Sequence, residues 1–458
     1  MIDTEKRNIK VVIMAGGKGS RIQSVNSDLP KPLIPINGKP ILQWEIECLV
    51  SQGFTEIILT VSHKAEMIES YFGDGKDYGS LITYYKETTP LGNAGALFKL
   101  WESGELDGDF LLLNADSMFD VDFHRFLSFH QKHSALASLF THPNSHPYDS
   151  GLIITASDGS GRVEQWLTKE DARPEFYKNR VNAGLHILNT VVLEQAVHSG
   201  ISTEKIGQPD ESGNIYKVDL DRQVLKPLAG TGKLYAYDSP EYVKDMGTPE
   251  RFEAVSADLE SGLVASRNLS KPQKAIFLDR DGTINKYAGF VRNTDEFSLL
   301  PGVAEAIKLI NASGYLAIVI TNQPVIARGE MTEEQLTTIH NKMETMLGEQ
   351  GAYIDAIYYC PHHPDKGFSG EVEALKIDCD CRKPKPGLIL RAVQDFNIDI
   401  EASWMIGDGW RDVECGINAG TQTVLLTGEG TEGGECERQA DTTVPDLLRA
   451  VKQIICLQ

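Results

Sequence analysis

The sequence predicts an α/β protein built from two domains. Its 458 residues exceed the roughly 100–200 residues of a typical domain. Short apolar runs that suit buried strands alternate with amphipathic segments that suit helices, which is typical of sheets covered by helices. The alternation restarts near residue 274, so two separate sheets are expected. We therefore predict domains at residues 1–262 and 274–458, joined by a polar linker at residues 263–273.

Each half begins with a short apolar run. Strands are expected at residues 11–15, 56–61 and 110–113 of the first half, and at 274–279, 316–320 and 403–406 of the second. Helices are expected at residues 40–52 and 301–313, each followed by glycine. A further helix is expected to begin at Thr332, because Thr332 and Gln335 have the spacing of a capping box.

The charge balance narrows the range of partners. The chain has 65 acidic and 44 basic residues, a formal net charge of −21, so nucleic acid and anionic membrane surfaces are not expected as partners. No run of 18 apolar residues and no apolar leader near the start is present, so a cytoplasmic protein is expected. The seven cysteines form an odd set, which favours metal binding over disulfides. A homo-oligomer is left open.

The segment FLDRDGTIN places two aspartates two residues apart after the first strand of the second half. Asp279 is expected to attack a phosphate and become an aspartyl-phosphate. Asp281 is expected to protonate the leaving oxygen and then to activate water. Carboxylates this close repel one another unless a cation lies between them, so Mg²⁺ is expected here.

Three further residues follow in an order that suits phosphoryl transfer. Thr321 ends a predicted strand, and its hydroxyl can bind a phosphoryl oxygen. Lys383 can neutralise the charge of the phosphate and the nucleophile. Asp408 ends another strand and can complete the Mg²⁺ site with Asp279 and Asp281, and Asp412 follows close by. The ordered set predicts a phosphatase.

This half resembles the haloacid dehalogenase-type phosphatases, which implies a Rossmann-like parallel sheet. Within them it is similar to the D-glycero-D-manno-heptose 1,7-bisphosphate 7-phosphatases and, more distantly, to the histidinol-phosphate phosphatases. The resemblance covers nearly all of residues 274–430, and the segment TNQPVIARGEM indicates the heptose branch. It implies that four residues bind substrate: Asn322, Gln323, Arg328 and Arg382. Gly409 stands where this family often has lysine.

Two short pairs of metal-ligand residues precede Lys383. They form the pattern C-x-H followed by C-x-C, and comprise Cys360, His362, Cys379 and Cys381. Three thiolates and one imidazole fill a tetrahedral site, so a structural Zn²⁺ that closes the loop between the pairs is expected. His363 is the adjacent alternative ligand, and the resemblance favours His362.

The first half carries a glycine-rich loop after its first strand. In the segment VVIMAGGKGSRI, Gly16, Gly17 and Gly19 allow backbone N–H groups to approach phosphates, and Arg21 supplies a fork of donors. Neither a P-loop nor a dinucleotide fingerprint is present, because the required spacings are missing. Lys31 follows in the segment PKP and is expected to reach the same phosphates.

Together these segments resemble the sugar-1-phosphate nucleotidyltransferases over roughly residues 9–255. The resemblance implies a Rossmann-like mixed sheet, catalytic Arg21 and Lys31, and Mg²⁺ held by Asp116 and Asp245. It also implies that four residues line the base and sugar sites: Gly92, Asn182, Gly184 and Lys169. The Glu-Lys pair usual in this family is Thr168-Lys169 here.

The two resemblances together imply one pathway. The second half would remove the 7-phosphate of a heptose 1,7-bisphosphate, and the first half would transfer a nucleotidyl group, with GTP favoured as donor, to the heptose 1-phosphate. One alternative keeps both activities with a mannose-type hexose and a phosphatase of another metabolite, such as histidinol phosphate. Another is an N-terminal domain that senses a sugar nucleotide without catalysis.

Overall fold

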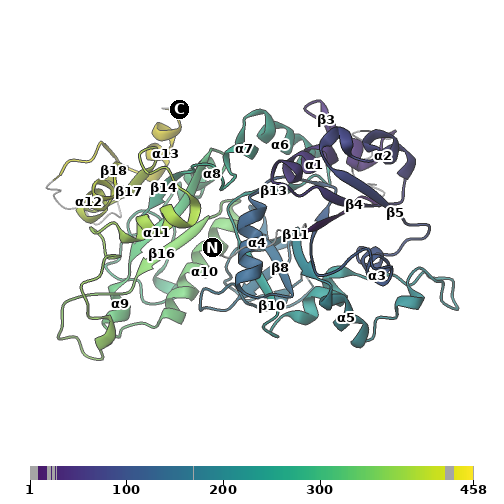
Figure 1. The fold of residues 1–458 in the computed structure, drawn as a ribbon. Coiled ribbons are helices and arrows are strands. Elements are labelled where there is room, and N and C mark those ends of the chain that lie inside the picture. Colours follow the sequence, from purple (N-terminus) through teal and green to yellow (C-terminus); the bar gives the residue numbers. More distant parts are fainter. Residues whose placement is uncertain are drawn as a thin grey trace, which may run out of the picture. The chain divides into compact units, whose positions relative to one another are not determined.

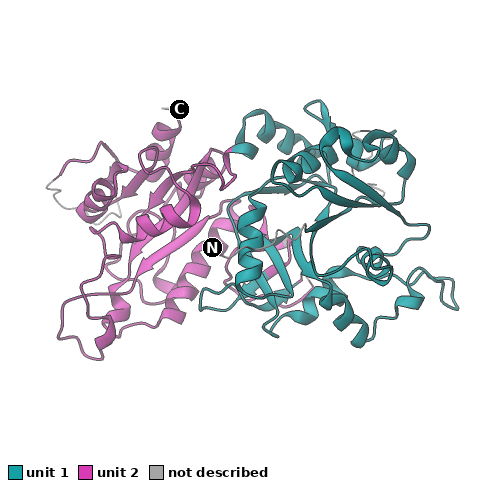
Figure 2. Ribbon diagram, in the orientation of Figure 1, with its two compact units in different colours: residues 1–141, 153–167, 182–265 teal, residues 142–152, 168–181, 266–458 magenta. Residues whose placement is uncertain are grey.

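The computed structural model describes residues 9–17, 22, 26, 28–168, 170–428 and 438–456. Three residues named above, Gly19, Arg21 and Lys169, lie outside this part of the chain. The chain divides into two compact units (Figure 2). Unit 1 comprises residues 1–141, 153–167 and 182–265, and unit 2 comprises residues 142–152, 168–181 and 266–458. The predicted domain bounds and linker stay a prediction.

The first part of the chain contains the elements of unit 1 (Figure 1). Its strands are β1 (Lys10–Met14), β2 (Pro35–Ile36), β3 (Lys39–Pro40), β4 (Glu56–Val61), β5 (Leu81–Lys86), β6 (Asp109–Asn114), β7 (Ser117–Asp120), β8 (Ala137–His142), β9 (Leu152–Thr155), β10 (Val163–Leu167), β11 (Val181–Asn189), β12 (Leu234–Asp238) and β13 (Tyr242–Asp245). Its helices are α1 (Ile41–Ser51), α2 (Ala65–Phe72), α3 (Gly95–Glu102), α4 (Phe123–Lys132), α5 (Val191–His198), α6 (Pro249–Glu260) and α7 (Leu263–Ser266).

The main sheet of unit 1 is mixed. Its central path runs β10-β9-β11-β6-β1-β4-β5. β1 is parallel to β4 and β6, whereas β11 is antiparallel to β6. Successive side chains of a strand point to opposite faces, and β1 accordingly sends Val11 and Ile13 to one core cluster and Val12 to another. A separate antiparallel ladder joins β13 to β7.

The second part of the chain contains a second sheet. Its strands are β14 (Lys274–Leu278), β15 (Tyr315–Asn322), β16 (Ala356–Cys360), β17 (Trp404–Gly407), β18 (Gln422–Leu426) and β19 (Thr442–Val444). Its helices are α8 (Val303–Asn311), α9 (Pro324–Ala327), α10 (Glu333–Glu349), α11 (Gly387–Phe396), α12 (Trp410–Ala419) and α13 (Leu447–Cys456). The strands lie in the order β16-β15-β14-β17-β18-β19, and each pair is parallel.

Helices cover both faces of this parallel sheet. One core cluster joins Ile276 and Leu278 of β14 to buried residues of α8, α10 and α13. The other joins Ala275 and Phe277 of the same strand to residues of α11 and α12. The resulting three layers leave the carboxyl ends of the strands as the edge where loops from several strands meet.

The expected α/β class, with a mixed first sheet and a parallel second sheet, is confirmed. The capping box is also present, since the Thr332 hydroxyl accepts from the Gln335 N–H and the Gln335 side chain accepts from the Thr332 N–H. Pro40 is the residue before α1 rather than its first residue.

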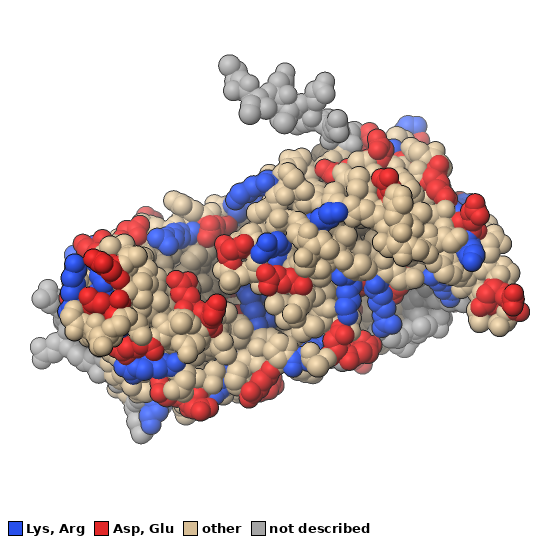
Figure 3. Space-filling view, turned by 90° about the horizontal axis from the view of Figure 1, so that it is seen from below, with Lys and Arg blue, Asp and Glu red and all other residues tan. Residues whose placement is uncertain are grey.

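Two observations concern the whole chain. On the face drawn in Figure 3, acidic and basic side chains are interspersed over the described residues. Among the described helices, none combines the length and apolar character needed to cross a bilayer.

Two candidate active sites and a candidate metal centre

The first candidate site lies at the carboxyl ends of the parallel strands in unit 2. β14 ends one residue before Asp279, β15 contains Thr321, and β17 ends one residue before Asp408. Because β14 pairs in parallel with both β15 and β17, these three side chains start from the same edge of the sheet. The Asp279 N–H donates to the Ile406 carbonyl at 3.0 Å, which ties the first loop to β17.

Lys383 makes two ion pairs at the centre of this edge. Its Nζ lies 2.6 Å from Asp279 Oδ1 and 2.6 Å from Asp412 Oδ1, and all three side chains are largely buried. Burial alone lowers the pKa of Lys383, but the charges of Asp279 and Asp412 outweigh it and raise that pKa above its usual value. Lys383 is therefore a cation at neutral pH, held against one oxygen of Asp279.

Asp279, Asp408 and Asp412 form a cluster of buried carboxylates. One oxygen from each lies within 4.8 Å of the others. Burial raises the pKa of Asp279, Lys383 opposes this, and the charges of Asp412 and Asp408 add to it. Gly282, at φ +87°, keeps the turn close, since a Cβ there would overlap the Asp408 carboxylate. Three acids around one lysine leave excess negative charge, which suits a divalent cation with oxygen ligands.

Asp281 is oriented differently from the other carboxylates. Its two oxygens accept from Arg280 Nη2 at 3.0 and 2.8 Å, and from Asn285 Nδ2 at 3.0 Å. Gln323 Nε2 donates to Asp281 at 2.9 Å and to the Thr321 hydroxyl at 2.8 Å. Donors on several sides fix this carboxylate in one orientation, and Gln323 links it to the Thr321 hydroxyl.

Guanidinium groups gather beside this edge. Arg328 Cζ lies 4.6 Å from the ring centre of Phe290 and 4.4 Å from that of Phe368. Burial lowers the pKa of Arg382, and the like charges of Arg411 and Arg328 lower it further. The Asn322 side chain holds the backbone of Lys383, accepting from its N–H at 3.0 Å and donating to its carbonyl at 3.1 Å. Neighbouring cations of this kind suit an anionic ligand.

The four predicted zinc ligands lie together. One ligand atom from each of Cys360, His362, Cys379 and Cys381 lies within 4.8 Å of the others. The three sulfur–sulfur distances are 3.2, 3.3 and 3.5 Å, and His362 Nδ1 lies 3.3 Å from Cys381 Sγ. A zinc–sulfur bond of about 2.3 Å implies roughly 3.8 Å between ligands of a tetrahedron. His363 is directed elsewhere, with Nε2 3.3 Å from Arg328 Nη2.

The second candidate site is a cavity of about 490 Å³ in unit 1. This volume is within the range of small-molecule sites, roughly 300–1,000 Å³. Of the predicted residues within the described part of the chain, five line it: Gly16, Gly17, Lys31, Gly92 and Asp116. Its walls also contain apolar side chains of Met14, Ile22 and Leu97.

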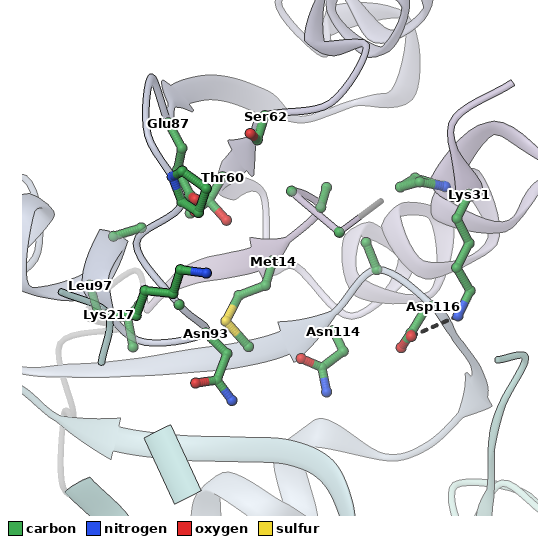
Figure 4. A pocket seen from close by; sticks show the side chains of 18 of the residues that line it. Met14, Lys31, Thr60, Ser62, Glu87, Asn93, Leu97, Asn114, Asp116 and Lys217 are labelled. Atoms are coloured by element: carbon green, nitrogen blue, oxygen red, sulfur yellow. Dashed lines mark hydrogen bonds and ion pairs between the residues drawn. The ribbon is translucent and has the colours of Figure 1, made fainter. Parts of the chain in front are cut away.

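One end of the cavity is charged. Lys31 is buried, and its Nζ lies 2.7 Å from Asp116 Oδ2 (Figure 4). Asp245 is brought to the same end because β13 pairs with β7, and the Met246 N–H donates to the Asp116 carbonyl at 2.9 Å. Burial raises the pKa of Asp245, but hydrogen bonds and charge from Arg251 outweigh it and lower that pKa. Asp245 itself does not line the cavity, because its two carboxylate oxygens accept from Arg251 Nη1 at 2.9 and 2.7 Å, so one carboxylate and one lysine line this end with Asp245 next to them.

Two other predicted residues that the structure describes in this half, Asn182 and Gly184, do not line the cavity. Gly184 is absent from its lining, but a Cβ on Gly184 would lie 2.8 Å from the Asn114 amide nitrogen, and Asn114 lines the wall. Asn182 hydrogen-bonds His186 at 3.2 Å and accepts from the Gly184 N–H at 3.2 Å. Gly92, at φ +83°, packs directly against the Val218 backbone.

Sequence reasoning missed several buried charged residues. Glu45 is almost fully buried and accepts from the Ser117 N–H at 3.4 Å, and burial with the nearby Asp116 raises its pKa. Arg280 is fully buried, and its Nη1 lies 3.3 Å from His340 Nε2. Arg280 lies between Asp279 and Asp281 in the sequence, and this position could have indicated that Arg280 belongs to the active site. Glu45 and His340 occur on helices with no motif around them.

Comparisons with known proteins match these two sites to two families. Residues 10–262 match the nucleotidyl transferase family, and residues 380–450 match a HAD-hydrolase-like family. The D-glycero-beta-D-manno-heptose-1,7-bisphosphate 7-phosphatase of Escherichia coli K12 is 40% identical over 190 residues, which are 40% of this chain and 97% of that protein. The same-named protein of Pasteurella multocida is 41% identical over 186 residues, 39% of this chain and 97% of its own length.

The chain belongs to the nucleotidyl transferase family. Its second half also belongs to the heptose bisphosphate phosphatase family, because the chain covers nearly the whole of those relatives. The prediction that one chain joins a nucleotidyltransferase to a haloacid dehalogenase-type phosphatase is confirmed, and both halves belong to enzyme families.

Solved structures also match both halves of this nucleotidyltransferase–phosphatase chain. HddC from Yersinia pseudotuberculosis with GMP-PN is 25% identical, with a TM-score of 0.42, over 55% of this chain and 99% of that one. D,D-heptose 1.7-bisphosphate phosphatase from B. bronchiseptica with magnesium and phosphate is 33% identical, with a TM-score of 0.35, over 41% of this chain and 100% of that one.

Proposed function

We propose that the chain carries out two consecutive steps in the synthesis of a nucleotide-activated heptose. The second half would hydrolyse the 7-phosphate of D-glycero-D-manno-heptose 1,7-bisphosphate, the substrate in the names of its phosphatase relatives. The product would keep its 1-phosphate, which is the group that a sugar nucleotidyltransferase needs as acceptor. The first half would transfer a nucleotidyl group from an NTP, with GTP favoured, and release pyrophosphate.

The observation that carries the phosphatase assignment is the contact of Lys383 with Asp279. Lys383 holds Asp279 Oδ1 at 2.6 Å, which leaves Oδ2 to attack phosphorus and form the aspartyl-phosphate. The Thr321 hydroxyl and Lys383 would bind the phosphoryl oxygens. Asp281, held by Arg280 and Gln323, would give its proton to the leaving sugar oxygen and later take one from the attacking water.

The acid cluster fits Mg²⁺. Carboxylates of Asp279 and Asp408 would hold it, and the ion would supply positive charge against the transferring phosphoryl group. The Asp281 carboxylate, which the sequence predicts at the same ion, accepts from Arg280 and Gln323, and we propose that it also transfers the proton. Arg328 and Arg382 would bind the phosphate that stays on the sugar.

The nucleotidyltransfer site would act by positioning the sugar 1-phosphate against the NTP and by neutralising the charge of their phosphates. In-line attack by the sugar 1-phosphate on the α-phosphate of the NTP moves negative charge onto the leaving pyrophosphate. Lys31 would neutralise this charge, and Arg21 and the glycine-rich loop would bind the remaining phosphates. Asp116 and Asp245, once Asp245 leaves Arg251, would hold a second Mg²⁺, which would orient the same phosphates. Lys169 and Asn182 would contact the sugar phosphate.

The cluster of three cysteines and His362 fits a structural Zn²⁺, because its sulfur and nitrogen atoms already lie near tetrahedral spacing. The ion would close the loop that precedes Arg382 and Lys383, and so hold both residues at the active site. A cytoplasmic location would keep these thiols reduced. It would also supply the NTP and sugar phosphates.

The test is a substrate panel on the full chain with Mg²⁺. Phosphate release is measured with the α and β anomers of heptose 1,7-bisphosphate, histidinol phosphate and hexose bisphosphates. Pyrophosphate release is measured with heptose 1-phosphate, mannose 1-phosphate and each NTP. We expect a heptose bisphosphate to have the highest kcat/KM for phosphate release, and heptose 1-phosphate the highest for pyrophosphate release.

Each alternative has its own outcome in this panel. Preference for histidinol phosphate, or for mannose 1-phosphate, would overturn the heptose assignment of the corresponding half. Phosphate release without pyrophosphate from any pair of substrates would show that the first half binds sugar nucleotides without catalysis.

A further inference from the structure

A buried arginine and a buried histidine lie behind the proposed general acid of the phosphatase. The Arg280 side chain is fully buried, and its Nε and Nη2 donate to the Asp281 carboxylate at distances of 2.8, 3.0 and 3.3 Å. The remaining terminal nitrogen of Arg280, Nη1, lies 3.3 Å from Nε2 of His340. The reaction proposed above gives His340 no role.

The histidine is the acceptor in this contact. A guanidinium group carries only donors, so Nε2 of His340 must accept from Arg280. Burial lowers the pKa of His340 well below its usual value, and the charge of Arg280 lowers it further. The imidazole is therefore neutral at pH 7, with its proton on Nδ1. A neutral acceptor satisfies Nη1 without competing with Asp281 for the positive charge.

His340 connects this ion pair to the core of unit 2. Arg280 and Asp281 are neighbours in one turn, so their ion pair alone would move with that turn. His340 lies on α10, 60 residues further along the chain, and α10 begins with a capping box. The residues that pack α10 into the core include Leu336, Ile339 and Met343.

The contacts of Arg280 fix the orientation of its guanidinium plane. Because the group is planar and rigid, contacts on two of its sides determine how it lies. Nε and Nη2 face Asp281, and Nη1 faces His340, whose ring centre lies 6.0 Å from that of Tyr359 in β16. Gln323, which follows β15, donates to the same carboxylate at 2.9 Å. The Asp281 carboxylate is thus held relative to α10 and to the end of β15.

We propose that His340 is a positioning residue for phosphoryl transfer, acting through Arg280 on the Asp281 carboxylate. This inference rests on the proposed phosphatase function, in which Asp281 gives its proton to the leaving sugar oxygen. That transfer requires hydrogen-bond reach, and a misplacement of about 1 Å can cost on the order of 100-fold in rate. His340 takes no part in the proton transfer itself.

The leaving group separates loss of positioning from general damage to the fold. A sugar alkoxide is a poor leaving group that needs the proton of Asp281, whereas p-nitrophenolate leaves with little help. The assay compares kcat/KM for heptose 1,7-bisphosphate and for p-nitrophenyl phosphate with Mg²⁺. For both substrates, kcat/KM reports the steps up to release of the leaving group and excludes hydrolysis of the aspartyl-phosphate.

His340→Met should lower kcat/KM for the heptose bisphosphate by roughly 10- to 100-fold and should change kcat/KM for p-nitrophenyl phosphate little. Asp281→Asn should show the same pattern with a larger decrease, about 10²- to 10⁴-fold. Adding His340→Met to Asp281→Asn should lower either value little further, because both changes remove the same function.

A conservative variant and a structural control accompany these changes. His340→Gln should keep most of the wild-type ratio of the two kcat/KM values, because its side-chain oxygen can accept from Arg280 Nη1. Leu347→Ala, two turns further along α10, removes a fully buried core side chain. It should lower the stability of unit 2, measured by hydrogen exchange, and leave the ratio unchanged.

The outcomes separate this inference from the function on which it rests. If the wild type releases phosphate from no substrate, the proposed phosphatase fails. If the wild type is active and His340→Met lowers both kcat/KM values equally, the positioning role is overturned. Equal ratios in His340→Met and His340→Gln have the same consequence. Should His340→Met not fold, His340→Asn replaces it, since its shorter amide stops near the place of Nδ1 and leaves Arg280 without an acceptor.

Discussion

Replacing Lys383 by methionine should destabilise unit 2 as well as abolish phosphate release. The two ion pairs at 2.6 Å are largely buried, so Lys383→Met would leave Asp279 and Asp412 as adjacent buried charges without their cation. Removing one partner of a buried ion pair costs about 3–5 kcal/mol. The matched control is Lys385→Met, because the ion pair between Lys385 and Asp378 is exposed and screened by water, so its loss should change stability little.

The assay is hydrogen exchange of the amides in β14 and β17, which reports the free energy of opening of this region without requiring the whole chain to unfold in one step. We expect faster exchange in Lys383→Met, partial recovery when Asp412→Asn is added, and little change in Lys385→Met. Adding Mg²⁺ to Lys383→Met should also slow amide exchange again in part, because Asp279, Asp408 and Asp412 would regain a cation. Equal exchange in the Lys383 and Lys385 variants would refute this reasoning.

The stability that unit 2 loses in Lys383→Met should depend on pH, and the loss should be smaller at lower pH. Burial raises the pKa of Asp279 in the folded state, and the loss of Lys383 removes the charge that opposes this rise. The folded variant then binds a proton more tightly than the unfolded chain does. Its stability relative to wild type should therefore increase as the pH falls from 7 through the folded-state pKa towards the ordinary range of an aspartate, about 4.

Three further changes test the sites separately. Cys379→Ser should lose the metal, and wild type and Cys415→Ser should each contain about one zinc per chain by elemental analysis; a metal-free, fully active wild type would remove the zinc assignment. Asp279→Asn should abolish phosphate release and keep pyrophosphate release, whereas loss of both in a folded variant would contradict two independent sites. Lys31→Met should lower pyrophosphate release by at least about tenfold, corresponding to one lost charged hydrogen bond, with phosphate release unchanged; equal loss of both activities would argue for misfolding.

The sequence predicted the parts of the sites that depend on local patterns. Asp279 and Asp408 follow strands whose apolar runs are visible, and parallel pairing then brings strand ends together. The zinc ligands occur as two close pairs, so their spacing alone indicated a shared ion. Lys383 was found because a motif surrounds it, although 104 residues separate it from Asp279.

Other features depend on tertiary packing that no local pattern encodes. The second ion pair of Lys383, with Asp412, exists because α12 begins beside the loop that carries Lys383, and sequence spacing gave only the proximity of Asp412 to Asp408. Glu45 lies on an ordinary amphipathic helix, and its burial beside Ser117 arises from the packing of α1 against β7. Residues 142–152 and 168–181 group with unit 2 although their composition does not distinguish them from their surroundings.

The most direct test of the account supplies the wild-type chain with heptose 1,7-bisphosphate, GTP and Mg²⁺, and follows phosphate and pyrophosphate in one reaction. The account predicts that phosphate appears first and pyrophosphate follows, and that Asp279→Asn yields pyrophosphate only when heptose 1-phosphate is supplied. Phosphate release without any pyrophosphate, even with heptose 1-phosphate and every NTP, would contradict it.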